Sequence, residues 1–439
     1  MQTLVAFLFV LGVLVFVHEL GHFLAARRIG VRVLTFSLGF GPKLFKTTRG
    51  DTEYCISAIP LGGYVKMAGE SPDDPRSGAP DEFMSKSKWE RFQVLIMGPV
   101  MNIVLAVVVL AGVLAQGAEV PAYQDQPPVV GAVTPNGPAA RADIRRGDRI
   151  LTVAGDTVDT WDRFFMAIAT RANRDISVSL LRDGQTMSVD LKPEPQTKYE
   201  IGDIGALPDA TPIIQSVVAN DPADKAGLKA GDFVLAVNGE VMATRLQLVD
   251  AISRNSGNAT DLLIRRDGQE QHITVTPEKR GDRGMIGIAI TEETKMFTPT
   301  PWEAVKLSVQ RNYEGSGLIF RTLGGLFVGQ TSLKQLQGPV AIAQLSGESA
   351  KLGWIALFSL MATLSLNLGI LNLLPIPMLD GGHIVIMGLE GIARRDFSMQ
   401  VKEKMLLAGF VLILMLMVTV IYNDLTRISW IERLMLWRN

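Results

Sequence analysis

Two histidines and a glutamate stand together in a stretch that is otherwise apolar. Residues 13–26 read VLVFVHELGHFLAA and include His18, Glu19 and His22. Residues four apart share one face of a helix, so the two imidazoles can hold one metal ion while Glu19 lies beside the water that the ion activates. This H-E-x-x-H pattern is typical of zinc-dependent hydrolysis. A pair of histidines capping a helix end is the alternative, but it gives Glu19 no role.

A catalytic zinc site needs a third protein ligand and an open fourth position. The chain has four histidines, of which His272 lies in a strand-like run and is interpreted as a surface residue. The other candidates lie in residues 367–383, NLGILNLLPIPMLDGGH, which contain Asp380 and His383. Spacing alone leaves both of them open.

Two prolines, Pro375 and Pro377, interrupt the helical pattern just before Asp380. Irregular backbone at membrane depth is tolerated where it is buried in protein or lines a watered cavity, so an aspartate there can turn toward the histidine pair. Counted from the N-terminal end of its helix, at about 1.5 Å per residue, His18 lies roughly 22 Å into the membrane, which is beyond the midplane and toward the cytoplasm. Asp380 follows a helix that runs in the same direction, so the two depths agree.

The elements that must position these residues are membrane helices. The chain has 439 residues, of which 47% are hydrophobic, and this is more than a single soluble core needs. Its net charge of −1 gives no excess of basic residues for binding nucleic acid. Its single cysteine excludes an intrachain disulfide. The first apolar run lacks the basic start of a signal peptide and is interpreted as a retained helix. Four windows of roughly 20 apolar residues predict membrane spans: residues 3–26, 94–118, 354–378 and 405–421.

Lysines and arginines are concentrated in residues 27–91 and 394–404, and the positive-inside rule places both loops in the cytoplasm. The N-terminus, residues 119–351 and the C-terminus are then expected outside. Residues 300–348 are amphipathic, with apolar runs too short to cross, and we expect them to lie at the outer surface. If they did cross, the third span would reverse and the depth argument for Asp380 would fail.

The extracytoplasmic region contains an internal repeat. Residues 129–158 and 213–242 align without a gap, and matching positions such as Asn136 and Asn220, or Gly147 and Gly231, differ by 84. Short alternating runs between G-D, N-G and D-G turns predict strands. Two copies of one module are therefore expected.

The two copies resemble PDZ domains, the second more closely, because AGLKAGDFVLAVNGE in residues 226–240 matches the helix–turn–strand signature of that family. PDZ domains bind an extended peptide by strand addition. The first copy departs from this signature, with Asp143 where the second has Gly227, and the departure bears on peptide binding by the first copy. A role of both copies as spacers is the alternative. The resemblance implies these peptide-binding positions: Gly227, Leu228, Gly231 and Asp232.

Four motifs together resemble the site-two protease family of intramembrane zinc metalloproteases, closest to its bacterial branch with two tandem PDZ domains. They are HELGH at 18–22, GFGP at 39–42, GPVMN at 98–102 and NLLPIPMLDGG at 372–382. By this resemblance His18, His22 and Asp380 hold zinc, Glu19 is catalytic and Asn372 lies close to the active site.

The same resemblance assigns a re-entrant β-element to residues 52–67, TEYCISAIPLGGYVKM. Adding the unwound substrate to its edge would replace the hydrogen bonds that a cut helix gives up. An ordinary cytoplasmic hairpin is the alternative. The expected substrate-binding residues are Gly62, Gly63, Tyr64, Val65, Pro375 and Pro377.

The prediction is an α-helical polytopic membrane protein with four transmembrane helices, a re-entrant β-element and two inserted PDZ domains of the α+β type. Its expected parts are residues 1–118 and 352–439 in the membrane, PDZ domains at 125–198 and 209–292, and the amphipathic segment 300–348.

The expected activity is zinc-dependent intramembrane endopeptidase activity in a bacterial inner membrane, with the PDZ domains in the periplasm. The resemblance implies single-span substrates, namely an anti-sigma factor after a first periplasmic cut and signal-peptide remnants. A membrane-anchored PDZ scaffold or chaperone with a structural metal is the alternative, and a metal transporter is a weaker one. Glu19 discriminates, because a structural site has no use for a general base and usually closes with four protein ligands.

Overall fold

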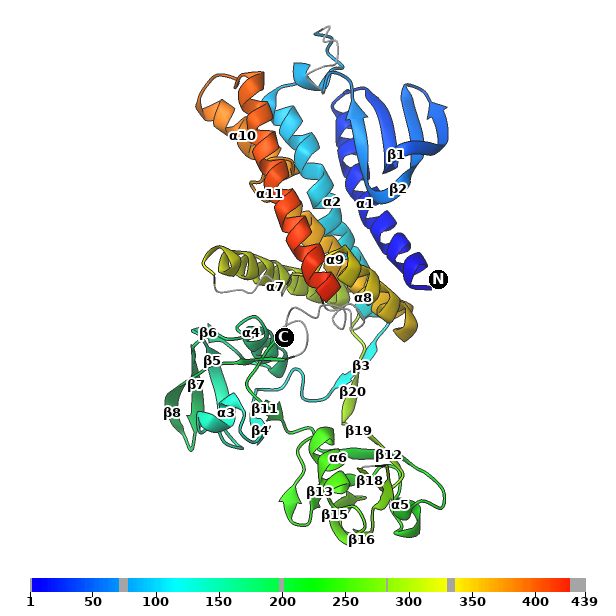
Figure 1. The fold of residues 1–439 in the computed structure, drawn as a ribbon, viewed down its shortest axis with the longest axis vertical. Helices are drawn as coiled ribbons and strands as arrows, with labels where there is room; N and C mark the ends of the chain where they lie inside the picture. The colour runs from blue at the N-terminus through cyan, green and yellow to red at the C-terminus, as the bar shows by residue number, and fades with distance from the viewer. Residues whose placement is uncertain (1, 71–77, 197–200, 282, 330–335, 427–439) are drawn as a thin grey trace. The chain divides into compact units, whose positions relative to one another are not determined.

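The computed structural model describes residues 2–70, 78–196, 201–281, 283–329 and 336–426. Contacts divide the chain into two compact units. The helical unit comprises Met1–Gly117, Thr298–Phe327 and Leu336–Asn439, and the repeat unit comprises Ala118–Phe297 and Val328–Gln335. Figure 1 labels the elements of both units.

Four helices of the helical unit are long and apolar enough to cross a membrane, as the sequence predicts. Three of them are α1 (Gln2–Arg28), α2 (Lys88–Ala115) and α11 (Met399–Thr426). The remaining one, α9 (Trp354–Asn372), ends six residues before the predicted limit at 378. The chain leaves the helix there because Pro375 disfavours helical conformation in the residue before it and cannot donate a backbone hydrogen bond.

The described residues of this unit form three further helices, α7 (Pro301–Phe327), α8 (Pro339–Leu352) and α10 (Asp380–Ile392), and one 3₁₀ turn at Phe83–Ser85. Helix α7 is amphipathic and is not among the four candidate spans of the described residues. Its Ser308 donates a hydrogen bond of 2.7 Å to the Val107 carbonyl of α2, while Trp302 and Tyr313 are exposed. Residues 330–335 of the predicted amphipathic segment lie outside the described residues.

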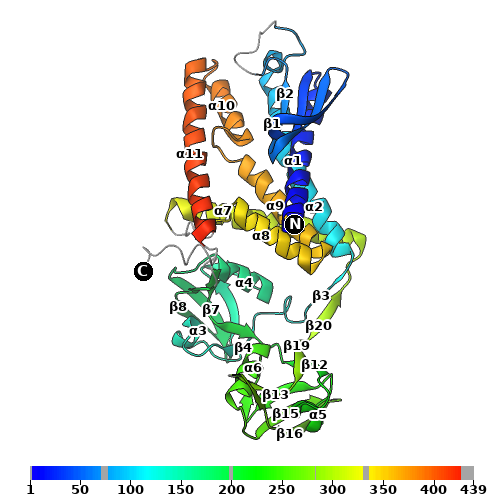
Figure 2. The ribbon, with the colours of Figure 1, turned by 45° about the vertical axis from the view of Figure 1, so that its right-hand side comes forward.

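Strands β1 (Val33–Arg49) and β2 (Thr52–Met67) form a sheet that lies beside α1 in both views (Figures 1 and 2). The first half of β1 pairs with two parts of β2, since Phe36 is opposite both Val65 and Tyr54. The second half of β1 pairs with residues 52–57. Residues 63–67 are therefore paired on one side only within the described part of the chain, and we call them the edge segment.

Glycines set the spacing between the three central helices. A Cβ on Gly21 of α1 would lie 2.4 Å from the Met97 carbonyl oxygen of α2, and a Cβ on Gly369 of α9 would lie 2.9 Å from the Pro99 carbonyl oxygen. Real Cβ atoms do not approach backbone so closely, so these helix backbones pack in direct contact. Helix α2 is thereby held between α1 and α9.

The repeat unit contains two sets of elements that recur at an offset of about 84 residues, which we call the first and second module; the last two strands of the first module lie at residues 201–208, beyond the expected domain end at 198. In the first module the order β6-β5-β7-β8 forms one sheet and β11 pairs with β4, and in the second module the main path is β16-β15-β13-β12-β19. Equivalent positions are fully buried in both modules, such as Ile150 and Val234, or Leu180 and Ile264. The first module consists of β4 (Val130–Val133), α3 (Pro138–Arg141), β5 (Arg149–Val153), β6 (Asp156–Thr157), α4 (Trp161–Ala169), β7 (Ile176–Arg182), β8 (Gln185–Leu191), β9 (Glu194–Gln196), β10 (Ile201–Asp203) and β11 (Ala206–Pro208).

The second module repeats this order of elements. A separate two-stranded ribbon is formed by β3 (Ala118–Pro121), which precedes the first module, and β20 (Thr294–Phe297), which follows the second. The last strand of the second module, β19, pairs with its first strand, β12, and stands at the end of the sheet. It consists of β12 (Ile213–Val217), α5 (Pro222–Lys225), β13 (Phe233–Val237), β14 (Glu240–Val241), α6 (Arg245–Arg254), β15 (Thr260–Arg266), β16 (Gln269–Val275), β17 (Glu278–Arg280), β18 (Arg283–Met285) and β19 (Ile288–Thr291).

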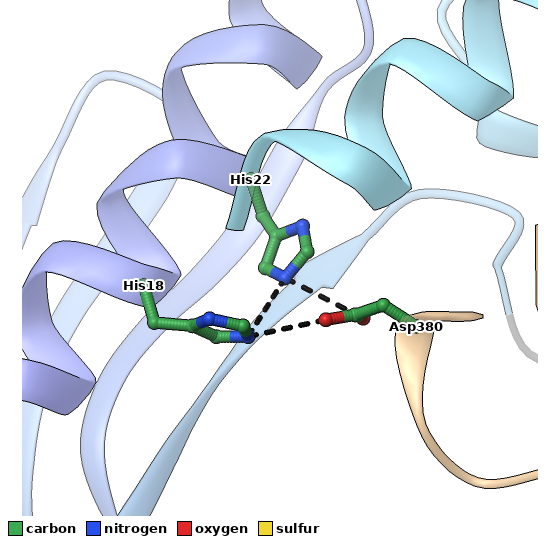
Figure 3. A group of neighbouring side chains, drawn as sticks. All are labelled: His18, His22 and Asp380. Atoms are coloured by element: carbon green, nitrogen blue, oxygen red, sulfur yellow. Dashed lines mark hydrogen bonds and ion pairs between the residues drawn. The ribbon is translucent and has the colours of Figure 1, made fainter. Parts of the chain in front are cut away.

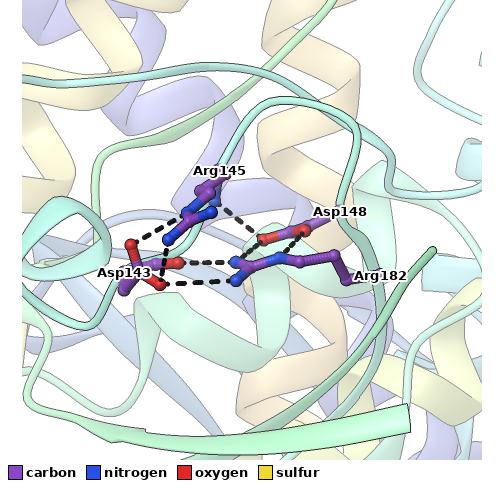
Figure 4. A network of polar contacts seen from close by, with 4 residues as sticks. All are labelled: Asp143, Arg145, Asp148 and Arg182. Carbon is purple, nitrogen blue, oxygen red and sulfur yellow. Dashed lines mark hydrogen bonds and ion pairs between the residues drawn. The ribbon is translucent and has the colours of Figure 1, made fainter. Parts of the chain in front are cut away.

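A buried ion pair recurs at the same place in each module. Asp148 pairs with Arg182 at 2.6 Å and Asp232 pairs with Arg266 at 2.7 Å, and both aspartate side chains are 1% exposed. In the first module Arg182 also reaches Asp143, which is paired with Arg145 (Figure 4). Asp143 has φ +57° where Gly227 has +82°, and aspartate tolerates this left-handed conformation better than most residues.

Burial alone would raise the pKa of Asp148, but the hydrogen bonds from the Arg182 guanidinium and the Arg145 amide outweigh it and hold the pKa below its usual value. A depressed folded-state pKa contributes stability above the unfolded value, and that stability is lost as the pH falls through the folded-state pKa. The first module should therefore be sensitive to acid below about pH 4.

Replacing Arg182 with leucine should lower the free energy of unfolding of the first module by about 3–5 kcal/mol, because the buried Asp148 carboxylate loses its partner. Hydrogen exchange of the β7 amides in the full-length protein, followed from neutral pH into acid, measures this loss. Arg145→Leu removes an exposed pair and should cost less than about 1 kcal/mol. Equal effects of the two substitutions would contradict the structural role of the Asp148–Arg182 pair.

Candidate metal centre

Three side chains from distant parts of the chain converge in the helical unit: His18, His22 and Asp380 (Figure 3). The two histidine Nε2 atoms lie 3.2 Å apart. Asp380 Oδ2 lies 3.2 Å from Nε2 of His18, and Asp380 Oδ1 lies 3.6 Å from Nε2 of His22. Donor atoms that share a tetrahedral zinc ion at about 2 Å lie roughly 3.3 Å from one another, so this spacing fits zinc.

The polar chemistry of the centre also fits a metal ion. Asp380 Oδ2 is buried and, within the described part of the chain, has no hydrogen-bond partner of adequate geometry, despite its closeness to His18. A buried carboxylate oxygen without a hydrogen bond is costly unless something else binds it. Two imidazoles and one carboxylate, with a fourth position open, are a ligand set that zinc accepts.

The first element that builds the centre is α1, which carries both histidines on one face, four residues apart. The second is the turn between α9 and α10, which delivers Asp380 as the first residue of α10. A Cβ on Gly381 would lie 2.2 Å from the Leu373 carbonyl oxygen, and a Cβ on Gly382 would lie 2.1 Å from the Ile376 carbonyl oxygen. The two glycines after Asp380 thus let the proline-containing turn fold back against α10.

This turn is strained and tightly packed. Met378 has φ +93°, which is rare for a residue with a long side chain and typical of functional sites. The Pro377 carbonyl oxygen faces Gly409 of α11, where a Cβ would come within 2.0 Å. Pro377 is therefore held between α10 and α11, and Pro375 lies earlier in the same turn, where it is exposed.

The edge segment lies next to Glu19. A Cβ on Gly63 would come within 3.1 Å of Glu19 Cγ and within 2.9 Å of Val15 Cγ1, so the strand backbone is in contact with α1 at this glycine. Gly62 has φ +126° and packs against Phe40, whose ring stacks on Tyr64 with centroids 6.1 Å apart.

Val65 is buried in the cluster that joins the sheet to α1. Asn372 lies at the end of α9, and its Nδ2 is 3.4 Å from His18 Nε2. Its amide therefore faces the metal-binding side of that ring.

The other sequence candidates lie elsewhere. Among the described residues, the group of converging donor atoms includes Asp380 and not His383, which is exposed on α10. His272 is exposed on β16 and pairs with Asp261 at 2.8 Å. In the second module Leu228 is buried in the core and Asp232 is paired with Arg266, while Gly227 and Gly231 have positive φ.

Sequence reasoning gave no role to the face of α2 that touches the histidines. His22 Nδ1 lies 2.8 Å from the Val94 carbonyl oxygen, and His18 Nδ1 lies 3.2 Å from Asn102 Nδ2. A backbone carbonyl leaves no signal in a sequence. The signal for Asn102 was an amide in the middle of an apolar span, the same argument that singles out His18.

Comparison with known proteins gives one consistent result. The model of peptidase family M50 matches residues 6–416. The regulator of sigma E protease of Salmonella typhi is 34% identical, over 97% of this chain and 99% of that protein. RseP of Escherichia coli, also named as a regulator of sigma-E protease, is 33% identical over 97% and 98%, and a Vibrio cholerae protein named as a zinc metalloprotease is 35% identical over 97% and 98%.

Among solved structures, one match covers a single module of the chain. The PDZ domain of the SdrC-like protein of Listeria monocytogenes aligns with 19% of this chain and 90% of its own length, at 18% identity and a TM-score of 0.18. A score this low adds no argument to the strand order described above.

Gly98 provides a test of the metal centre, because a Cβ there would lie 2.2 Å from His22 Nε2 and 2.9 Å from His18 Cε1. Gly98→Ala should displace the histidine rings and lower the zinc bound per protein molecule, measured after dialysis by elemental analysis. The matched control is Gly112→Ala on the same helix, where a Cβ meets no atom within 4 Å. It should keep full zinc content and gain helix stability of up to about 1 kcal/mol. Full zinc content in Gly98→Ala would contradict this packing.

Proposed function

Since this chain belongs to peptidase family M50 and is a metalloendopeptidase of the site-two type, we propose that it uses zinc to cut the transmembrane segments of single-span proteins within the membrane. One observation carries this proposal. His18, His22 and Asp380 converge on a common point, with Glu19 and the edge segment beside them.

His18, His22 and Asp380 would hold the zinc ion. When bound, zinc polarises the scissile carbonyl and acidifies the attacking water, acting as a Lewis acid. Three protein ligands leave a fourth position open, which distinguishes a catalytic site from a structural one.

The chain's own groups would handle the protons and the charge. In the H-E-x-x-H pattern the glutamate lies beside the activated water, so the Glu19 carboxylate would take the proton of the attacking water and deliver it to the leaving amine. Asn372 would donate a hydrogen bond from Nδ2 to the substrate carbonyl oxygen, where negative charge develops.

A transmembrane helix must unwind before it is cut, because its carbonyls are hydrogen-bonded within the helix. The unwound backbone needs new partners, at a cost of several kcal/mol for each group left unpaired in lipid. We assign this role to the edge segment together with Gly62 before it, so that Gly62, Gly63, Tyr64 and Val65 would bind the substrate as an added strand. The contact between Gly63 and Glu19 would bring that strand to the catalytic carboxylate.

The proposed location is the inner membrane, with the active site toward the cytoplasm and both modules in the periplasm. The support is the concentration of lysine and arginine in residues 27–91 and 394–404. The modules, interpreted as PDZ domains, would exclude substrates that still carry a folded outer domain. An edge strand such as β19 is where such domains accept a peptide.

The proposed substrates are an anti-sigma factor already trimmed outside the membrane, and signal-peptide remnants. The names of the Salmonella and Escherichia coli relatives, which describe regulation of sigma-E, support the first of these. Both substrates are single helices with a short outer tail, which is the shape that a sheet edge beside the metal centre can accept.

Glu19→Gln should keep zinc and lose cleavage of a single-span substrate by at least about 100-fold, because the general base is gone and the ligands are not. The measurement compares wild type and variant in detergent, with chelator and then zinc add-back. Glu90→Gln, in the exposed capping box at the start of α2, is the control and should cleave normally. Wild type that binds zinc and cuts nothing, even without residues 118–297, would favour the scaffold alternative.

Consecutive backbone N–H groups of a strand point to opposite sides of that strand. Of the two variants Tyr64→Pro and Val65→Pro, one therefore removes an N–H group that bonds to β1, and the other removes an N–H group at the unpaired side, where the substrate would bind. We expect one of the two variants to keep its zinc and thermal stability and to lose cleavage. Thr47→Pro, on the opposite edge of the sheet, is the control and should cleave normally. Normal cleavage by both variants would exclude substrate pairing at the edge segment.

A further inference from the structure

Asn102 is a fully buried amide in the apolar helix α2. Its Nδ2 is 3.2 Å from His18 Nδ1, while its Oδ1 is buried and has no hydrogen-bond partner among the residues that the structure describes. A buried polar group without a partner typically costs about 1–3 kcal/mol. The mechanism described above gives this amide no role.

The chemistry of a ligand histidine fixes which end of the amide belongs at the ring. A neutral imidazole that offers Nε2 to a metal carries its proton on Nδ1, so Nδ1 is a donor and needs an acceptor. With Nδ2 toward His18, two donors would face each other. The two ends of an amide have nearly the same shape, and a half-turn of the Asn102 side chain brings Oδ1 to the ring.

We propose that Asn102 is a positioning residue for the metal centre, in which Oδ1 accepts the Nδ1–H of His18 and thereby holds the ring with Nε2 directed at the metal. The unpartnered oxygen then acquires the donor that the ring supplies. This inference rests on the metal site of the proposed function and adds a residue that acts through His18.

A second observation supports this role, because α2 serves the other histidine in the same way. His22 Nδ1 lies 2.8 Å from the Val94 carbonyl oxygen. Val94, Gly98 and Asn102 are spaced by four residues and so share one face of α2. Along that face, one residue offers an acceptor to each ring, and the glycine between them leaves room for both rings.

Asn102 is itself held in place from the opposite side. Ser365 of α9 is fully buried and donates a hydrogen bond of 2.7 Å to the Asn102 carbonyl oxygen. One turn further along α9, Gly369 contacts the backbone of α2 at Pro99. The helix that orients the histidines is therefore fixed to the helix that leads to Asp380.

The test measures metal binding by the full-length protein in detergent, using zinc against a competing chelator and the visible absorption of bound Co²⁺. Asn102→Leu keeps the size of the side chain and removes the acceptor, so zinc should bind about 10–100-fold more weakly and the Co²⁺ spectrum should change. Asn102→Asp keeps the oxygen, so zinc affinity should stay within a few-fold of wild type. Thr363→Ala is the control, because it removes an exposed hydroxyl of α9 that donates only to the Ser359 carbonyl oxygen of the same helix, and it should leave the Co²⁺ spectrum unchanged.

Wild-type affinity in Asn102→Leu would overturn the inference. An equal loss in Asn102→Asp and Asn102→Leu would also overturn it, because it would mean that the amide acts through its N–H. Should Asn102→Leu not fold, Asn102→Asp decides alone: retained affinity supports the inference and a loss of tenfold or more overturns it. Failure of the wild type to bind zinc is a different result, which would refute the proposed function.

Discussion

The cost of polar groups inside an apolar helical bundle is the constraint on which the rest of the helical unit depends. His18, His22, Asp380 and Asn102 are each expensive alone in such surroundings, and they occur together because each supplies what another lacks. In the proposed function a metal ion would complete the set, because it would bind Asp380 Oδ2, which has no hydrogen-bond partner among the described residues. The chemistry and the stability of this region therefore rest on the same contacts.

Convergence of these groups requires backbones to approach more closely than side chains normally allow. Gly21, Gly98 and Gly369 provide this at the helix contacts, and Gly381 and Gly382 provide it where the proline-containing turn meets α10. At each of them a Cβ would lie within 3 Å of a neighbouring atom. The glycines thus act as spacers of fixed size, and the strained φ of Met378 is a local cost of directing Asp380 inward.

Local patterns in the sequence predicted what local physics determines. Apolar runs gave the four long helices, the 84-residue offset gave two equivalent modules, and H-E-x-x-H gave two donors on one face. Long-range pairing was not predictable in this way. The position of Phe36 between two parts of β2 depends on register, and the roles of Asn102 and the Val94 carbonyl depend on how α2 meets α1. The end of α9 was misplaced because apolar residues continue beyond the helix up to Met378, whereas Pro375 stops it.

The hydrogen-bond needs of an unwound substrate explain why a metal centre and a sheet edge belong in one unit. An unwound strand in lipid is stable only while a partner strand supplies its hydrogen bonds, so it cannot travel far from the edge that holds it. Cleavage then requires the catalytic carboxylate to lie at that edge. Gly63 satisfies this requirement, since a Cβ there would lie 2.7 Å from the Ser37 carbonyl oxygen of β1 and 2.9 Å from Val15 Cγ1, so glycine lets the edge segment lie against α1 beside Glu19. In the proposed mechanism, unwinding and hydrolysis therefore share one position on α1, and a protein with the metal centre but without the edge segment would bind zinc and leave transmembrane helices intact.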